Sequence, residues 1–130
     1  AGGLWVREAE GPVLAYVRAY AKGPGRTPLA GNSSGTDRAF LARDMTELES
    51  WLHYRVIDVS SIKELSRHWF PRAYFASPEK GGAHRALADI RKSIDELRYY
   101  RRAVFQPEPG IDSETARAIA AEVTAGHPPA

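Results

Sequence analysis

Cysteine is absent from this chain, and methionine occurs only once. The lack of cysteine excludes disulfides, thiolate metal sites and cysteine nucleophiles. A metal ion, if one binds, must therefore be held by oxygen or imidazole ligands. A chain without thiols suits a reducing compartment, and we expect a cytoplasmic protein.

Long hydrophobic runs and a strong net charge are also lacking. No apolar run approaches the roughly 20 residues that a membrane-spanning helix needs, so no membrane location is expected. The formal net charge is +2 and the pI is near 9.1. This is too weakly basic to indicate binding of long nucleic acids, but it is compatible with a short anionic ligand.

The first residues lack the features of a natural start. Ala1, Gly2 and Gly3 include no initiator methionine, and no basic region leads into an apolar segment as in a secretory signal. We therefore expect the chain to begin inside a larger one.

The 130 residues, 43% of them apolar and 26% charged, have the composition of one soluble domain. The pattern of apolar residues and breakers predicts helices at 4–21, 37–52, 61–70, 84–105 and 112–124, and strands at 28–32 and 54–59. The strand at 28–32 is nearly continuously apolar, which predicts burial. Ser61 and Glu64 predict a capping box, and residues 72–82 a binding loop. Two short strands rarely form a stable sheet alone, so either further strands precede Ala1 or the domain is an unusual helical one.

The segment 81–105 carries the longest helical pattern. Four apolar side chains at three- and four-residue spacing predict one stripe that faces a core: Leu87, Ile90, Ile94 and Leu97. His84 and Asp89 fall at the border of that stripe, where a site can be built. A surface histidine and a solvated carboxylate are the ordinary alternative.

Asp37 stands where the predicted strand at 28–32 gives way to a helix. In open α/β sheets, ligands bind at the carboxyl ends of the strands, which makes Asp37 a candidate site residue. The ordinary alternative is a helix N-cap.

Three separated segments resemble one family. They are Gly31-Asn32-Ser33 with Asp37-Arg38; His53-Tyr54-Arg55 with residues 58–65; and His84-Arg85-Ala86-Leu87 with residues 89–101. Together, residues 28 to about 105 resemble the C-terminal part of the oligoribonucleases, ribonuclease H-like 3′–5′ exonucleases with four acidic metal ligands and a catalytic histidine.

The resemblance implies an α/β ribonuclease H-like exonuclease fold, N-terminally truncated, in which the first three strands of the mixed sheet are missing. Residues 1–105 would form the C-terminal portion of a single exonuclease domain. Residues 106–130 would form a linker and a tail with a short helix. The implied activity is removal of mononucleotides from the 3′ end of short RNA, down to dinucleotides.

The resemblance also assigns roles at the reacting centre. Asp37 and Asp89 would be ligands of two Mg²⁺ or Mn²⁺ ions, and His84 would be the catalytic base. Hard carboxylate oxygens suit these ions, and imidazole can accept a proton near neutral pH.

Further residues match groups that bind the substrate in this family. Ser33, Arg55 and Ser60 would grip its 5′ phosphate, which is suitable chemistry for an arginine and two hydroxyls. Tyr54 matches a tyrosine that the neighbouring subunit contributes, which implies a homodimer. The alternative for Tyr54 is an aromatic side chain that fills a core pocket.

One departure bears on activity. The family's first motif, an Asp and a Glu separated by one residue on the first strand, is absent. Asp112 and Glu114 have the spacing, but they stand at a predicted helix start after a proline-rich linker, so we reject them. We expect this chain to be inactive alone. The alternatives are a non-catalytic dimerisation or 5′-phosphate-binding module, and RNA binding by Arg98, Arg101 and Arg102 with Tyr99 and Tyr100.

Overall fold

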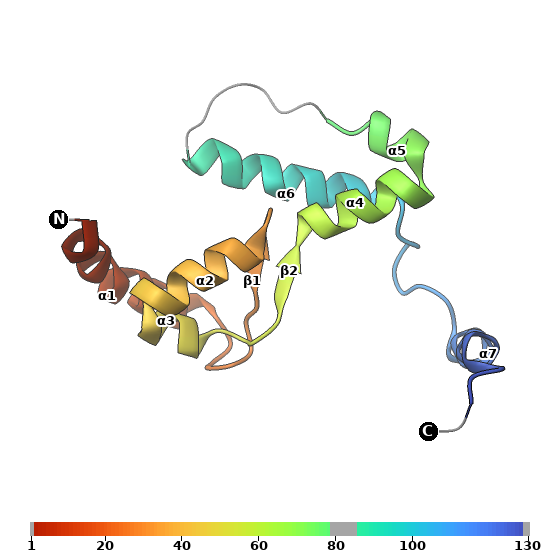
Figure 1. Ribbon diagram of the computed structural model, residues 1–130, viewed down its shortest axis with the longest axis horizontal. Helices are drawn as coiled ribbons and strands as arrows, with labels where there is room; N and C mark the ends of the chain where they lie inside the picture. Colours follow the sequence, from red (N-terminus) through yellow and green to blue (C-terminus); the bar gives the residue numbers. More distant parts are fainter. Residues whose placement is uncertain (1, 79–85, 129–130) are drawn as a thin grey trace.

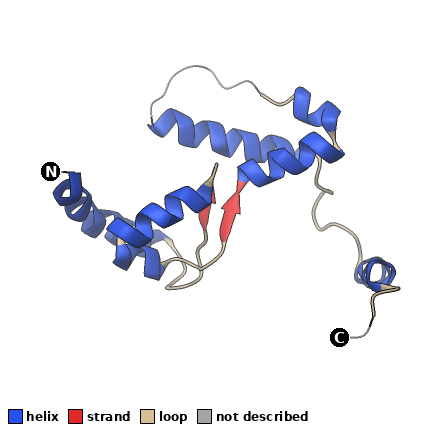
Figure 2. Cartoon of the chain, in the orientation of Figure 1, coloured by secondary structure: helices blue, strands red, loops and turns tan. Residues whose placement is uncertain are grey.

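The computed structural model describes residues 2–78 and 86–128. Seven helices and two strands follow one another along these residues: α1 (Gly2–Tyr20), β1 (Leu29–Gly31), α2 (Ser34–Asp44), α3 (Thr46–Trp51), β2 (Val56–Asp58), α4 (Val59–Trp69), α5 (Pro71–Phe75), α6 (Ala86–Ala103) and α7 (Ser113–Thr124). The described chain is therefore mostly helical, with a small sheet (Figure 2).

The sheet consists of β1 and β2, which run parallel. Leu29 lies opposite Val56 and Gly31 lies opposite Asp58. Because the strands are parallel, their carboxyl ends meet at one edge of the sheet. The buried Ser34 closes that edge, since its hydroxyl lies 3.0 Å from the carbonyl oxygen of Gly31 and 2.9 Å from that of Ile57.

The helices gather on two sides of this sheet. Figure 1 shows α1, α2 and α3 together at one side and α4, α5 and α6 at the other, with α7 standing apart. Leu14 of α1 and Leu48 of α3 are buried in the first group, and Val59 of α4 and Tyr100 of α6 in the second. The core of the described residues is thus small and divided between the two groups.

The predicted apolar stripe of α6 does not face a core within the described residues. Leu87, Ile90 and Ile94 are 59%, 57% and 45% exposed. The buried residues of α6 are Glu96 and Tyr100. Glu96 lies 3.5 Å from Lys63 of α4, so α6 packs on α4 with a different side. The burial predicted for the strand at 28–32 is also wrong, because Ala30 is exposed.

The single helix predicted over 37–52 is two helices. Met45 has φ −135° and ψ 64°, which is outside the helical region, and it separates α2 from α3. Arg38 then joins the two helices, since its Nε donates to Glu49 Oε1 at 2.9 Å. The apolar periodicity missed the break because it continues through both helices.

Two predictions around α4 are wrong as well. The helix is capped by Asp58, whose side chain accepts a hydrogen bond from the Ser60 amide, rather than by a Ser61–Glu64 box. Glu64 instead pairs with Arg67 and His68. The first part of the predicted loop 72–82 belongs to α5, which Pro71 begins at a position that favours proline.

The predicted C-terminal helix is confirmed as α7. Asp112 caps it by accepting a hydrogen bond from the Thr115 amide. Hydrogen bonding by the Thr115 side chain, and next by its amide, lowers the pKa of the Asp112 carboxyl. Every residue of α7 is exposed. Within the described ranges, no helix combines the length and apolarity needed to cross a membrane.

Candidate active site

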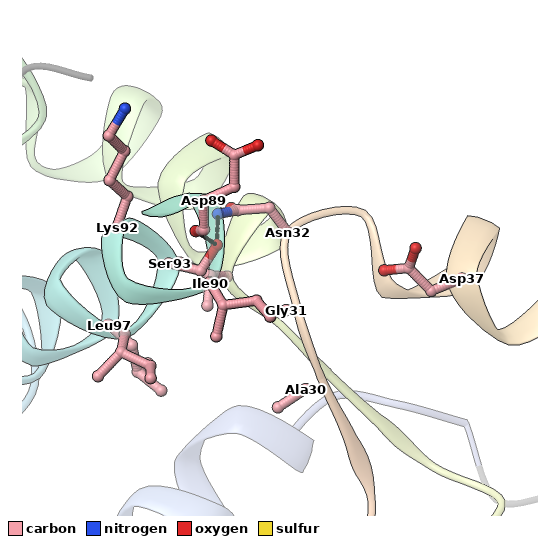
Figure 3. Close-up of a pocket in the computed structure, with 11 residues that line it drawn as sticks. Ala30, Gly31, Asn32, Asp37, Asp89, Ile90, Lys92, Ser93 and Leu97 are labelled. Atoms are coloured by element: carbon pink, nitrogen blue, oxygen red, sulfur yellow. Dashed lines mark hydrogen bonds between the residues drawn. The ribbon is translucent and has the colours of Figure 1, made fainter. Parts of the chain in front are cut away.

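A cavity of about 350 Å³ opens at the carboxyl end of β1, between that strand and α6. Figure 3 shows its polar lining, in which Asn32 of the β1–α2 loop lies between two carboxylates. These are Asp37, from the first turn of α2, and Asp89, from the first turn of α6. The structure therefore places the two carboxylates that the sequence indicated on the lining of one cavity, although 52 positions separate them in the chain.

Asp37 is not the N-cap of its helix. Ser33 precedes α2, and Asp37 lies inside the first turn. Its carboxylate reaches back toward the strand end: a Cβ placed on Gly31 would lie 3.9 Å from Asp37 Oδ2. The capping alternative for Asp37 is therefore wrong, and the carboxylate lines the cavity instead.

The donor set fits part of a metal centre. Asp37 and Asp89 offer the hard oxygen ligands that Mg²⁺ and Mn²⁺ prefer. In the part of the chain that the structure describes, no group of three or more His, Asp or Glu side chains could hold an ion. Two carboxylates alone are fewer ligands than such a group would supply. His84 lies outside the described residues.

Ser33 and Ser60 lie side by side next to this cavity. The Ser33 amide donates to Asp58 Oδ1 at 2.9 Å and to Ser60 Oγ at 3.1 Å. Ser33 has φ 56° and ψ 45°, a left-handed conformation that costs a non-glycine residue about 1 kcal/mol or more. These two hydrogen bonds offset that cost and hold the loop in place.

Asn32 links this serine pair to α6. Its Oδ1 accepts a hydrogen bond from Ser60 Oγ at 3.1 Å, and its Nδ2 donates to Ser93 Oγ at 2.7 Å. Ser93 Oγ in turn donates to the Asp89 carbonyl at 3.1 Å. Sequence reasoning missed both Asn32 and Ser93 as site residues. Asn32 stands inside the Gly31-Asn32-Ser33 motif, but Ser93 has no local signal because its role depends on a partner far away in the chain.

Tyr54 and Arg55 lie at the other end of β2. Arg55 Nε donates to the Tyr54 hydroxyl at 3.0 Å, and the Arg55 guanidinium lies 5.4 Å from the centre of the Tyr54 ring. Both residues precede β2, whereas Ser60 follows it, and three strand residues span about 10 Å. The chain does not bring these residues into the cluster of Ser33 and Ser60. Tyr54 is 74% exposed, so the core-filling alternative is wrong.

The arginine cluster near the end of α6 has local partners. Arg98 pairs with Asp95, and Arg101 with Glu108. Tyr100 is fully buried, and the Tyr99 hydroxyl donates to the Ala73 carbonyl at 2.6 Å. Tyr100 is therefore unable to stack on an RNA base in this conformation, which weakens the RNA-binding alternative for this surface.

The chain is similar in sequence to known exonucleases. The chain matches the RNase_T model, described as exonuclease, over residues 6–97. It is 68% identical over 127 residues to an oligoribonuclease of Streptomyces coelicolor, a match that covers 96% of this chain and 64% of that protein. It is 58% identical over 118 residues to an oligoribonuclease of Mycobacterium tuberculosis, covering 91% of this chain and 55% of that protein.

The chain thus spans less than two thirds of the length of these relatives. The exonuclease match nevertheless extends from α1 into α6 and includes both cavity carboxylates. The chain therefore belongs to the RNase_T exonuclease family, which has a ribonuclease H-like fold, and is a homologue of the oligoribonucleases.

Proposed function

We propose that this chain carries the C-terminal part of the catalytic domain of an oligoribonuclease. The complete site would hydrolyse short oligoribonucleotides and dinucleotides from the 3′ end to mononucleotides. One observation carries the proposal: Asp37 and Asp89 line the same cavity, in a chain 68% identical to an oligoribonuclease of Streptomyces coelicolor.

Asp37 and Asp89 would hold two divalent ions, Mg²⁺ or Mn²⁺, together with carboxylates from outside the described residues. Bound ions of this kind stabilise the charge that develops on the attacking water and on the leaving oxygen. His84 would accept the proton of the attacking water, because imidazole titrates near neutral pH.

The hydroxyls of Ser33 and Ser60 would bind the 5′ phosphate of the substrate. Ser33 and Ser60 each follow a residue that lines the cavity, Asn32 and Val59, so a bound phosphate would set the length of RNA that reaches the metal centre. Tyr54 and Arg55 lie at the opposite end of β2 and are exposed. We propose that they serve the site of a neighbouring subunit in a homodimer.

The uncovered stripe of α6 supports a further part of the proposal. An additional segment would pair with the edge of β1 that does not face β2, and this pairing would extend the sheet. The same segment would cover Ile90 and Ile94 and would supply the missing carboxylates. Alone, the chain is expected to be inactive and to self-associate through these apolar side chains. The exonuclease match ends at residue 97, and α7 is exposed, which supports a separate tail over residues 106–130.

The test uses a joined protein, in which this chain is fused to the segment of the Streptomyces coelicolor relative that it does not cover. Mononucleotide release from a 5′-phosphorylated RNA dinucleotide is measured with Mn²⁺ for the chain, the joined protein and its Asp37→Asn variant. Activity is expected only in the joined protein, with a loss of at least about 100-fold in the variant. Full activity in Asp37→Asn would refute the proposal.

Subunit mixing tests the roles of Tyr54 and Asp37 together. Asp37→Asn and Tyr54→Ala subunits are each inactive if both residues are required. If Tyr54 acts on the neighbouring subunit, mixing should restore about a quarter of the activity, because half of the dimers are mixed and each mixed dimer has one intact site. No recovery in dimers shown to have exchanged subunits would place Tyr54 in its own site.

A second candidate is a non-catalytic module that binds 5′-phosphorylated dinucleotides. It is favoured by the hydrogen-bonded Ser33–Ser60 pair and by the partial ligand set of the described residues. This module would bind pApA equally with Mn²⁺ and with EDTA, and Asp37→Asn would leave the affinity unchanged. If the chain is instead part of a metal-dependent exonuclease, the binding of pApA should weaken in EDTA.

A further inference from the structure

A continuous path of hydrogen bonds runs from the first turn of α4, through the loop after β1, to the turn of α6 that carries Asp89. Ser60 Oγ donates to Asn32 Oδ1, Asn32 Nδ2 donates to Ser93 Oγ, and Ser93 Oγ donates to the Asp89 carbonyl, at 3.1, 2.7 and 3.1 Å. Each hydroxyl gives its single proton once, so the path is chemically consistent. Figure 3 shows the Asn32–Ser93 bond at the wall of the cavity.

The Asn32–Ser93 hydrogen bond is well placed to hold the turn of α6 that carries Asp89. The Lys63–Glu96 ion pair holds α6 against α4, but Glu96 is seven residues beyond Asp89, which is about 10 Å along the helix. Leu87 and Ile90, the large apolar side chains near Asp89 in the sequence, are more than half exposed. The Asn32–Ser93 bond therefore lies closer to the metal-facing turn than the ion pair does.

We propose that Asn32 is a positioning residue, which acts through Ser93 to hold Asp89 at a set place relative to the phosphate-binding hydroxyls. The proposal rests on the function proposed above. Ser60 and Asp89 would then be held by one amide, with its oxygen on the phosphate side and its nitrogen on the metal side. Loss of the amide would disturb both sites, whereas loss of the Ser93 hydroxyl would disturb the metal side alone.

The experiment compares Asn32→Ala, Ser93→Ala and Ser93→Thr in the joined protein. Mn²⁺ binding is measured by titration calorimetry without substrate, and kcat and KM with 5′-phosphorylated dinucleotide. Asn32→Ala and Ser93→Ala should each weaken Mn²⁺ binding by about tenfold, as outer partners of metal ligands do. Ser93→Thr keeps the hydroxyl and should stay within about twofold of the parent.

The two alanine variants should differ in their effect on substrate. Both should lower kcat, but only Asn32→Ala should also alter KM, because it removes the acceptor that orients the Ser60 hydroxyl. The double variant should bind Mn²⁺ no more weakly than Asn32→Ala, since both changes break the same path. Ser61→Ala, at an exposed serine of α4, is the matched control and should have no effect.

The results separate the two proposals. If Asn32→Ala and Ser93→Ala bind Mn²⁺ as tightly as the parent while Asp37→Asn is inactive, Asn32 is not a positioning residue and the proposed function stands. If Asp37→Asn is fully active, both proposals fail. If Ser93→Thr binds Mn²⁺ as weakly as Ser93→Ala, the hydroxyl is not what positions Asp89, and the inference is overturned.

Discussion

Asn32 and Ser93 are 61 positions apart in the chain, and their side chains are joined by a hydrogen bond of 2.7 Å. The bond connects the loop after β1, which leads into the helix that carries Asp37, with α6, which carries Asp89. Side-chain hydrogen bonds between distant segments are a small share of those in folded proteins, so this one indicates a defined local geometry. The predictions below concern other contacts that hold this geometry.

Asp58 is expected to stabilise the loop after β1 and the start of α4 together. Its Oδ1 accepts from the amides of Ser33 and Ser60, at 2.9 and 3.0 Å. Asp58→Ala should lower the free energy of unfolding by about 2 kcal/mol, because two donors lose their acceptor. Asp58→Asn keeps one oxygen and should lose about half as much. Urea denaturation of the joined protein measures both, and equal losses would mean that the carboxylate charge, not the acceptor, is what matters.

Arg38 is expected to hold α2 and α3 in register. Its guanidinium donates to the Glu49 side chain, to the Glu49 carbonyl and to the His53 carbonyl, at 2.9, 3.2 and 2.6 Å. Arg38→Ala should lower the free energy of unfolding by about 2–3 kcal/mol. Arg38→Lys keeps the positive charge but not the several N–H donors of the planar guanidinium. It should therefore recover less than half of the lost free energy of unfolding. Full recovery by lysine in urea denaturation would contradict this geometric explanation.

Removing the hydroxyl should have different effects on stability at Tyr99 and at Tyr100, two neighbouring residues of α6. The Tyr100 hydroxyl is buried and finds no hydrogen-bond partner within the described residues, whereas the Tyr99 hydroxyl donates to the Ala73 carbonyl. Tyr100→Phe should leave the free energy of unfolding unchanged or raise it by up to about 1 kcal/mol, and Tyr99→Phe should lower it by about 1 kcal/mol. Thermal unfolding of the two variants compares them directly. A clear loss in Tyr100→Phe would reveal a partner for that hydroxyl.

Glu64 should remain ionised to unusually low pH. Hydrogen bonds from Arg67 and His68 lower the pKa of its carboxyl to about 2. A lowered pKa in the folded state means that the pair's stabilisation is present above the ordinary value near 4.5 and disappears as the pH falls through about 2. Carbon NMR of the Glu64 carboxyl should report this pKa. Because the pair is exposed, 1 M salt should raise the pKa, and an unchanged value would contradict a surface ion pair.

Metal should stabilise the joined protein through Asp89. Free Mn²⁺ at 100 times its Kd should add about 2.7 kcal/mol to the free energy of unfolding. Asp89→Asn should remove most of this gain, because a carboxylate ligand is lost. Thermal unfolding with Mn²⁺ and with EDTA measures the difference. An Asp89→Asn variant that gains as much from Mn²⁺ as the parent would show that the ion binds elsewhere.

Local patterns in the sequence were sufficient for much of the fold. The helix at 112–124 and the long helix before it were predicted because apolar spacing and the breakers that flank it are local features of the sequence. The break at Met45 escaped prediction because the apolar periodicity continues across it. The cap at Asp58 escaped because Ser61 and Glu64 satisfy the same local rule one turn later.

By itself, the sequence determined the order of the two strands and of most helices, and the motifs that identify the exonuclease family, since both are carried by residues close together in the chain. Only the tertiary structure decided which of those motifs meet. It placed Asp37 and Asp89 on one cavity, left Ile90 and Ile94 of α6 exposed, and put Tyr54 and Arg55 at the far end of β2. The physical reason is that these relationships depend on how α6 packs against α4 and β1, and no residue spacing within a single segment encodes that packing.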